Sequence, residues 1–185
     1  MIAGTIGAGK TTLAESLCQE NPDWVLCPEP LQENPFFDDF YSGDPATLKA
    51  VALKMQLWIL VSRVQNLHDI LSCPASHASR SGRSVVVDRS PYEDRIFARV
   101  LQKRGVITLD ELELYDRMFD TLVQALSLEE HQVEWKYLRV TPEVAMGRIL
   151  GRARKGEENI TLGYLQDLHD EYEKEFSRLA EFSGK

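Results

Sequence analysis

The sequence predicts an α/β fold of three layers, α/β/α, in which a central parallel sheet lies between helices. Short apolar runs alternate along the 185 residues with longer segments in which apolar residues recur every three or four positions. That order is typical of parallel strands joined by crossover helices. Because ligands of such sheets bind outside the carboxyl ends of the strands, the functional site is expected there. We expect a single domain over residues 1–185.

A glycine-rich loop follows the first apolar run, residues 1–3, and a helix that ends before Pro22 follows the loop. Residues 4–11 match the pattern G-x-x-x-x-G-K-[ST], whose backbone N–H groups surround the phosphates of a nucleoside triphosphate. Lys10 supplies a cation for the β- and γ-phosphates, and the Thr11 hydroxyl is a ligand for Mg²⁺. A turn that binds nothing has no need of Lys-Thr after its third glycine. The residues expected to bind ATP here are Gly4, Thr5, Ile6, Gly7, Ala8, Gly9, Lys10, Thr11 and Thr12.

A carboxylate follows the second predicted strand, residues 24–27. Glu29 lies between Pro28 and Pro30, so its backbone is stiff and cannot enter a helix. A carboxylate held there suits a general base that takes the proton of an attacking hydroxyl. An ordinary solvated glutamate in a turn explains the position equally well.

The next predicted element is a long helix over residues 48–71. Gln56 and Arg63 lie seven positions apart and therefore on one face, among apolar residues. A buried amide or guanidinium needs a partner, and Asp94 is a candidate for Arg63. Together these groups offer hydrogen bonds to the edge of a nucleobase; a surface stripe with an ion pair is the alternative. The segment that follows, residues 72–82, is predicted to be an exposed loop.

The third predicted strand, residues 84–87, ends at Asp88-Arg89-Ser90. Asp88 can orient a metal ion or the general base. Arg89 can stabilise the charge that develops on a transferred phosphoryl group. An ion pair without a role in catalysis is the alternative.

Two helices and a strand complete the predicted fold, and an arginine-rich segment lies among them. A helix is expected over residues 109–128, a strand over 137–140 and a helix over 162–182, whose apolar stripe indicates core or dimer packing. Thr141 and Pro142 are typical of a helix start. Four cations follow it near two glycines that can act as hinges, and two of them share a face and can reach one anion, which favours a lid rather than a solvated surface. They are Arg148, Arg152, Arg154 and Lys155.

Composition limits the classes of function. The net charge of −8 argues against a general nucleic-acid binder, whose surface would be basic. We find no apolar run long enough to cross a membrane and no leader sequence, so a cytoplasmic location is expected. The cysteines are Cys18, Cys27 and Cys73; their odd number and spacing favour reduced thiols over a disulfide framework or a zinc site.

Taken in order, these segments resemble deoxyribonucleoside kinases. The resemblance is greatest to the bacterial deoxyadenosine/deoxyguanosine kinase branch, because Asn-Pro-Phe-Phe-Asp-Asp-Phe-Tyr at positions 34–41 is similar to a segment typical of it. The similar segments are residues 4–12, 28–30, Gln56 with Arg63, 88–95 and 148–154.

The resemblance implies a P-loop kinase fold with an arginine-rich lid and a commonly dimeric enzyme, hence a homodimer here. It implies transfer of the γ-phosphate of ATP-Mg²⁺ to the 5′-hydroxyl of deoxyadenosine, deoxyguanosine or deoxycytidine in nucleotide salvage. The catalytic residues would be Glu29 as base, Arg89 beside it and Lys10. By the same resemblance, Asp88 lies near Mg²⁺. The base would be bound by Gln56, Arg63 and Asp94, and the sugar 3′-hydroxyl would be contacted by Tyr41 and Glu157. The donor phosphates would be bound by Arg148, Arg152 and Arg154.

Two other functions stay open. A nucleoside monophosphate kinase has the same loop and lid, but a carboxylate such as Glu29 in the acceptor site repels a phosphate. A relative without activity, acting as a structural subunit, is the non-enzymatic alternative. The presence of Lys10, Glu29, Asp88, Arg89 and the lid arginines argues against it.

Overall fold

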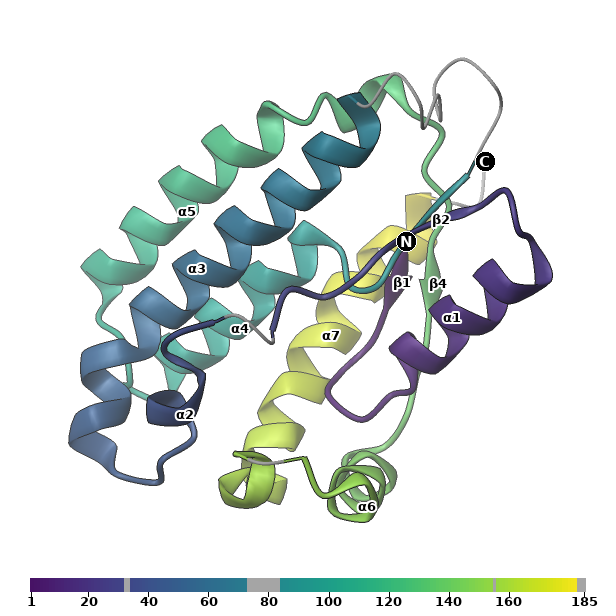
Figure 1. Cartoon of the computed structure of the whole chain (residues 1–185). Helices are drawn as coiled ribbons and strands as arrows, with labels where there is room; N and C mark the ends of the chain where they lie inside the picture. The colour runs from purple at the N-terminus through teal and green to yellow at the C-terminus, as the bar shows by residue number, and fades with distance from the viewer. Residues whose placement is uncertain (32–33, 73–83, 155, 183–185) are drawn as a thin grey trace.

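Strands and helices alternate through most of the computed structural model, which describes residues 1–31, 34–72, 84–154 and 156–182 (Figure 1). The elements in chain order are β1 (Ile2–Ala3), α1 (Lys10–Glu20), β2 (Val25–Cys27), α2 (Phe37–Phe40), α3 (Pro45–Ser72), β3 (Val85–Val87), α4 (Pro91–Lys103), α5 (Leu109–Gln124), η1 (Leu128–Glu130), β4 (Lys136–Tyr137), α6 (Pro142–Arg152), η2 (Glu157–Asn159) and α7 (Leu162–Phe182).

The strands pair in parallel, as expected. β2 pairs with β3 and β1 pairs with β4, and a single parallel bridge between Ile2 and Asp88 joins the two pairs. The resulting order is β2-β3-β1-β4. The phosphate loop after β1 therefore lies beside the residues that follow β3, and the chain after β2 lies next to those.

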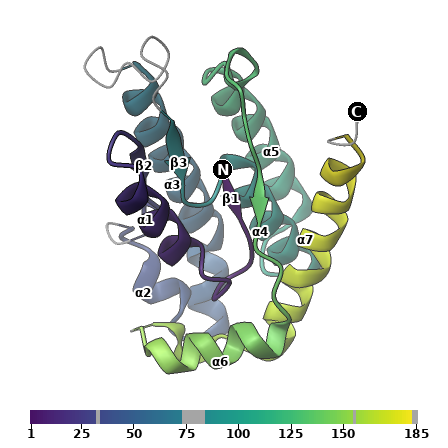
Figure 2. The ribbon, with the colours of Figure 1, turned by 90° about the vertical axis from the view of Figure 1, so that its right-hand side faces the viewer.

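The sheet lies between layers of helices. In Figure 1 the strands have α1 on one side and α4 and α7 on the other, with α3 and α5 beyond them. Figure 2 shows α6 lying across one end of the molecule. Leu13 and Leu17 of α1 pack on Ile2 and Val86 of the sheet, whereas larger clusters of buried residues fill the space among α3, α4 and α5 and between α4, α6 and α7.

Three predicted element boundaries were wrong by three residues or more. α3 begins at Pro45 rather than residue 48. α5 ends at Gln124 rather than 128, because residues 125–127 turn and Ser127 adopts a left-handed backbone (φ 46°) before η1. β4 covers Lys136–Tyr137 instead of 137–140: the N–H of Leu138 still bonds the carbonyl of Ala3 at 2.8 Å, but the chain then leaves the sheet towards α6.

One long helix, α4, was not predicted. Its start has the sequence of a capping box: the Glu93 side chain accepts from the N–H of Ser90 at 2.8 Å, the N–H of Glu93 donates to the backbone carbonyl of Ser90 at 3.2 Å, and Pro91 occupies the first helical position. The predicted loop at residues 72–82 lies, beyond Ser72, outside the described residues. Within the part of the chain that the structure describes, no helix combines the length and apolarity needed to cross a membrane.

Candidate active site

The loop after β1 forms a turn that only glycine accommodates at two positions. Gly7 and Gly9 have φ values of 77° and 96°, and a Cβ on Gly7 would lie 2.7 Å from the carbonyl oxygen of Ala145. Gly9 directly precedes α1, so the loop places its backbone at the N-terminus of that helix.

Lys10 lies folded back onto the loop. Its Nζ donates to the carbonyl oxygens of Gly4 and Thr5 at 2.8 and 2.9 Å. Burial, and next the neighbouring Arg89 guanidinium, lower the pKa of Lys10 to about 8. An anion in the loop would offer this ammonium a stronger partner than two carbonyls.

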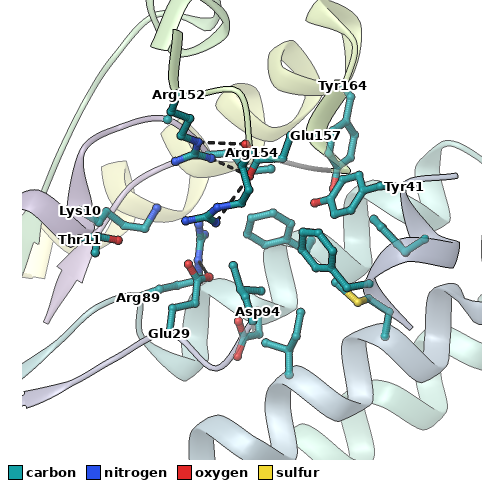
Figure 3. Close-up of a pocket in the computed structure, with 18 of the residues that line it drawn as sticks. Lys10, Thr11, Glu29, Tyr41, Arg89, Asp94, Arg152, Arg154, Glu157 and Tyr164 are labelled. Atoms are coloured by element: carbon teal, nitrogen blue, oxygen red, sulfur yellow. Dashed lines mark hydrogen bonds and ion pairs between the residues drawn. The ribbon is translucent and has the colours of Figure 1, made fainter. Parts of the chain in front are cut away.

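Glu29 is held by two arginines, as Figure 3 shows in part. Its Oε1 accepts from Nε of Arg89 at 2.5 Å and from Nη2 of Arg63 at 3.4 Å. Burial alone would raise the pKa of Glu29, but Arg89, Lys10 and Arg63 together outweigh it and lower the pKa to about 2. The carboxylate is therefore ionised across the physiological range.

Arg89 occupies an unusual backbone conformation. Its φ of 66° is left-handed, which is uncommon for a residue with a side chain. Nη1 of Arg63 donates to the carbonyl oxygens of Asp88 and Arg89 at 3.0 and 2.7 Å and so supports this turn. The turn directs Arg89 towards Glu29, which comes from the neighbouring strand end (Figure 3).

Asp88 and Thr11 form a pair of oxygen ligands suited to a hard cation. The Thr11 hydroxyl donates to Oδ2 of Asp88 at 2.6 Å. Oδ1 of Asp88 is buried and has no hydrogen-bond partner among the described residues. A buried carboxylate oxygen without a donor beside a threonine hydroxyl fits Mg²⁺, which binds through one or two such groups, substrate phosphates and water.

A cavity extends from the phosphate loop to the side chains that were predicted to bind the acceptor substrate. Its lining includes Lys10 and Thr11 at one end and, at the other, the predicted residues Glu29, Tyr41, Gln56, Arg89, Asp94 and Glu157. Apolar side chains complete it, among them Leu31, Phe37, Met55, Ile59 and Phe97. A pocket of this kind, apolar with a few convergent polar groups, suits a small organic ligand.

Arg63 lies behind the cavity rather than in its described lining. It is buried, and its Nε donates to Oδ2 of Asp94 at 2.7 Å, so the predicted pair between these residues is present. Burial raises the pKa of Asp94 to about 6, although Arg63 opposes the shift. The predicted contact of Arg63 with a nucleobase stays a proposal.

The arginine-rich segment contacts the loop and the cavity. Nη1 of Arg148 donates to the carbonyl oxygens of Gly7 and Ala8, at 3.3 and 2.9 Å. Arg152 makes a two-bond ion pair with the buried Glu157, at 2.9 and 2.7 Å, and Arg154 lies 3.6 Å from the same carboxylate (Figure 3). The lid cations are thus held by protein oxygens beside the phosphate loop.

Comparisons with known proteins agree with this geometry. Residues 1–184 match the family described as deoxynucleoside kinase. The chain belongs to this family. Among relatives of this kinase, a deoxyadenosine kinase of Dictyostelium discoideum is 32% identical over 173 residues, covering 92% of this chain but 63% of the relative. A deoxyguanosine kinase of Bacillus subtilis (strain 168) is 28% identical over 180 residues, with coverage of 97% and 79%.

The kinase also resembles solved structures. A deoxyadenosine kinase from M. mycoides with bound dCTP superposes with a TM-score of 0.77 at 27% identity, covering 96% of this chain and 82% of that one. The predicted P-loop kinase fold and the resemblance to deoxynucleoside kinases are therefore confirmed.

Sequence analysis missed some residues that shape this site in the kinase. Tyr164 of α7 lines the cavity, and its buried hydroxyl has no hydrogen-bond partner among the described residues. Phe97 of α4 lies under Arg89, with 4.6 Å between the guanidinium carbon and the ring centre. Recognition of α4 from its capping box would have placed Phe97 on the helix after Arg89, whereas Tyr164 gave no local signal.

Proposed function

We propose that this kinase transfers the γ-phosphoryl group of ATP to the 5′-hydroxyl of a deoxynucleoside. The observation that carries the proposal is the position of Glu29: an ionised carboxylate, paired with Arg89, lines the same cavity as Lys10 and the phosphate loop. A base on the acceptor side and cations on the donor side are the two parts that phosphoryl transfer requires.

The reaction proceeds by in-line displacement. The 5′-oxygen forms a bond to the γ-phosphorus as the bond from phosphorus to the β,γ-bridging oxygen breaks, and ADP leaves with that electron pair. Glu29 accepts a hydrogen bond from the 5′-hydroxyl and takes its proton. With a pKa of about 2, Glu29 is a weak base, which suits a loose transition state in which the proton leaves late.

The cations neutralise the charge of the moving group. Lys10 turns from the carbonyls of the loop to the β- and γ-oxygens, and Arg89 lies where it can contact both Glu29 and the transferred group. Thr11 and Asp88 are the residues that would hold Mg²⁺, which draws charge from the phosphate oxygens when bound. Arg148, Arg152 and Arg154 act on the donor phosphates from the lid.

The acceptor end suits a deoxypurine or deoxycytidine. Gln56 and Asp94 offer an amide and a carboxylate to the base edge, and Met55, Ile59 and Phe97 offer apolar surface to its faces. Tyr41 and Glu157 lie across the cavity, where they can contact the sugar 3′-hydroxyl. The names of the relatives, which include deoxyadenosine, deoxyguanosine and deoxycytidine kinases, support this class of acceptor.

We also propose a homodimer in the cytoplasm, with residues 1–185 as one domain. The adjacent helices α3 and α5 each leave large apolar side chains exposed, and both described cysteines, Cys18 and Cys27, are free thiols.

The decisive experiment measures ATP consumption with Mg²⁺ and each of four deoxynucleosides, for the unaltered kinase and for Glu29→Gln. Turnover is expected on a deoxypurine or deoxycytidine, and kcat should fall about 100-fold or more in the variant because the base is lost. As the control, Glu158→Gln makes the same change at an exposed glutamate and should retain activity.

Parallel reactions with ribonucleosides and dAMP separate the alternatives. Turnover on dAMP alone would identify a monophosphate kinase. If no ATP is consumed with any of these acceptors, the protein would be a structural subunit of the family.

A further inference from the structure

A buried carboxylate behind the cavity joins three parts of the site. Glu93, on the first turn of α4, is fully buried. Its Oε1 accepts from the backbone N–H of Gly4 at 3.0 Å and from the hydroxyl of Tyr172 at 2.9 Å, and its Oε2 accepts from the N–H of Ser90 at 2.8 Å. The start of the phosphate loop, the start of α4 and the middle of α7 therefore meet at one residue.

Tyr172 continues this chain of hydrogen bonds to Arg89. Its ring is fully buried and stacks beside Tyr137, with 6.2 Å between ring centres. The phenol oxygen accepts from Nη1 of Arg89 at 2.5 Å while its hydroxyl donates to Glu93. Burial raises the pKa of Tyr172 well above its ordinary value, so the hydroxyl keeps the proton that this donation requires.

The guanidinium of Arg89 is thereby fixed on three sides. Nε contacts Glu29, Nη1 contacts Tyr172, and the ring of Phe97 covers one face. Glu93 adds a negative charge 3.7 Å from Nη1. Rotation of Arg89 away from Glu29 would break the bond to Tyr172 and leave a buried acceptor unpaired.

We propose that Glu93 and Tyr172 are positioning residues for phosphoryl transfer: they hold Arg89 against Glu29 and tie this pair to the first glycine of the phosphate loop. This inference rests on the proposed function, in which Arg89 orients the base. Among the described contacts, Tyr172 reaches Glu29 through Arg89, and Glu93 acts on Arg89 through Tyr172 while it also holds the N–H of Gly4.

A purely structural role makes different predictions. A capping box and a core tyrosine stabilise α4 and α7 but have no particular connection to Arg89. Loss of the tyrosine hydroxyl would then lower the melting temperature and leave the kinetics of the folded enzyme unchanged.

The test compares Tyr172→Phe with Tyr137→Phe, using the deoxynucleoside that gives the fastest turnover. Both variants lose one hydroxyl from the same stack of rings, but the hydroxyl of Tyr137 bonds Glu173 rather than Arg89. We expect kcat to fall about 10-fold in Tyr172→Phe, with both KM values within about twofold of the original, because geometry rather than binding is lost. Tyr137→Phe should keep its kcat.

A double-mutant cycle with Arg89→Lys shows whether Tyr172 acts through Arg89. In the Arg89→Lys background, Tyr172→Phe should have little further effect on kcat, because the bond from Nη1 to Tyr172 is already absent. A full 10-fold loss in that background, or an unchanged kcat in Tyr172→Phe alone, would overturn the proposal. Glu93→Gln should reproduce the loss, but it also removes the charge of the capping box, so Tyr172→Phe decides.

A second measurement does not depend on turnover. In NMR spectra of the nucleotide-free kinase, the guanidinium N–H signals of Arg89 should be resolved and slow to exchange, remain so in Tyr137→Phe, and broaden in Tyr172→Phe. Unaltered signals in Tyr172→Phe would contradict the positioning role. If the unaltered kinase turned over no deoxynucleoside, the proposed function would fail and these spectra alone would decide whether Tyr172 fixes Arg89.

Discussion

The charge of Lys10 depends on its surroundings in the site and on whether phosphates are bound there. Its pKa of about 8 is low because burial, and then Arg89, disfavour the ammonium, whereas bound phosphates favour it and raise the pKa again. ATP binding should therefore take up a proton above pH 8, approaching about one per ATP near pH 9 and almost none at pH 7. Affinity should fall as the pH rises through this range.

Calorimetry in buffers of different ionisation enthalpy measures this uptake. Lys10→Arg, which stays charged throughout, should show none. Equal uptake in both proteins would place the titrating group elsewhere.

Thr11 should matter for metal binding more than for folding. Thr11→Val removes the hydroxyl next to Asp88, so the Mg²⁺ concentration for half-maximal activity should rise about 10-fold or more. The lost hydrogen bond should lower the free energy of unfolding by about 1 kcal/mol. Mg²⁺ titrations and urea unfolding separate the two effects, and Thr11→Ser should resemble the unaltered kinase in both.

The sequence predicted the residues that follow strand ends, because their chemistry is local. The loop with Lys10, the rigid Glu29 and the Asp88-Arg89 pair each stand directly after an apolar run, and the fold brings Lys10, Glu29 and Arg89 to one cavity. The placement of Arg63 behind the cavity depends on the packing of α3 against β2 and α4. The role of Tyr172 depends on contacts between residues about eighty positions apart, which no periodicity reveals.

At the scale of elements, α6 and η2 contribute Arg152 and Glu157 to the lining of the same cavity. Glu157 pairs with Arg152, so the residue proposed for the sugar also holds a cation proposed for the donor phosphates. Glu157→Gln should raise the KM for the deoxynucleoside about 10-fold, because a hydrogen bond to a charged group is lost. The KM for ATP should not rise, since Arg152 is released.

Steady-state kinetics with each substrate varied in turn test this difference between the two KM values. Glu158→Gln alters the exposed neighbour and should change neither KM. Parallel increases in both KM values for Glu157→Gln would show that the lid as a whole had lost its structure.

Element boundaries were predictable where a local signal ends the helix or strand. Thr141 caps α6 through the N–H of Val144, as the sequence indicated, and Leu162–Phe182 matches the predicted helix. β4 was predicted too long because alternating polar and apolar residues continue past the point where pairing with β1 ends. That end is set by the path towards α6, a tertiary effect.

For the whole molecule, the proposed dimer has a direct measurement. Light scattering at micromolar concentration should give twice the chain mass of 21.1 kDa. Val61 of α3 is 42% exposed and Leu114 of α5 is 50% exposed. Val61→Asp should shift the mass towards the monomer, because a charge enters an apolar interface, whereas Val144→Asp on α6 should not. A monomeric unaltered protein would exclude the dimer.

The order of the segments along the chain has a consequence for synthesis. The phosphate loop is synthesised before the other parts of the site, yet β1 can pair with β4 only once Lys136 has been made, and Arg89 can bond Tyr172 only once α7 has been made. The centre is complete only after nearly all of the described chain has been made. A translation product interrupted before α7 would carry every residue of the phosphate loop and the general base, and would still be inert.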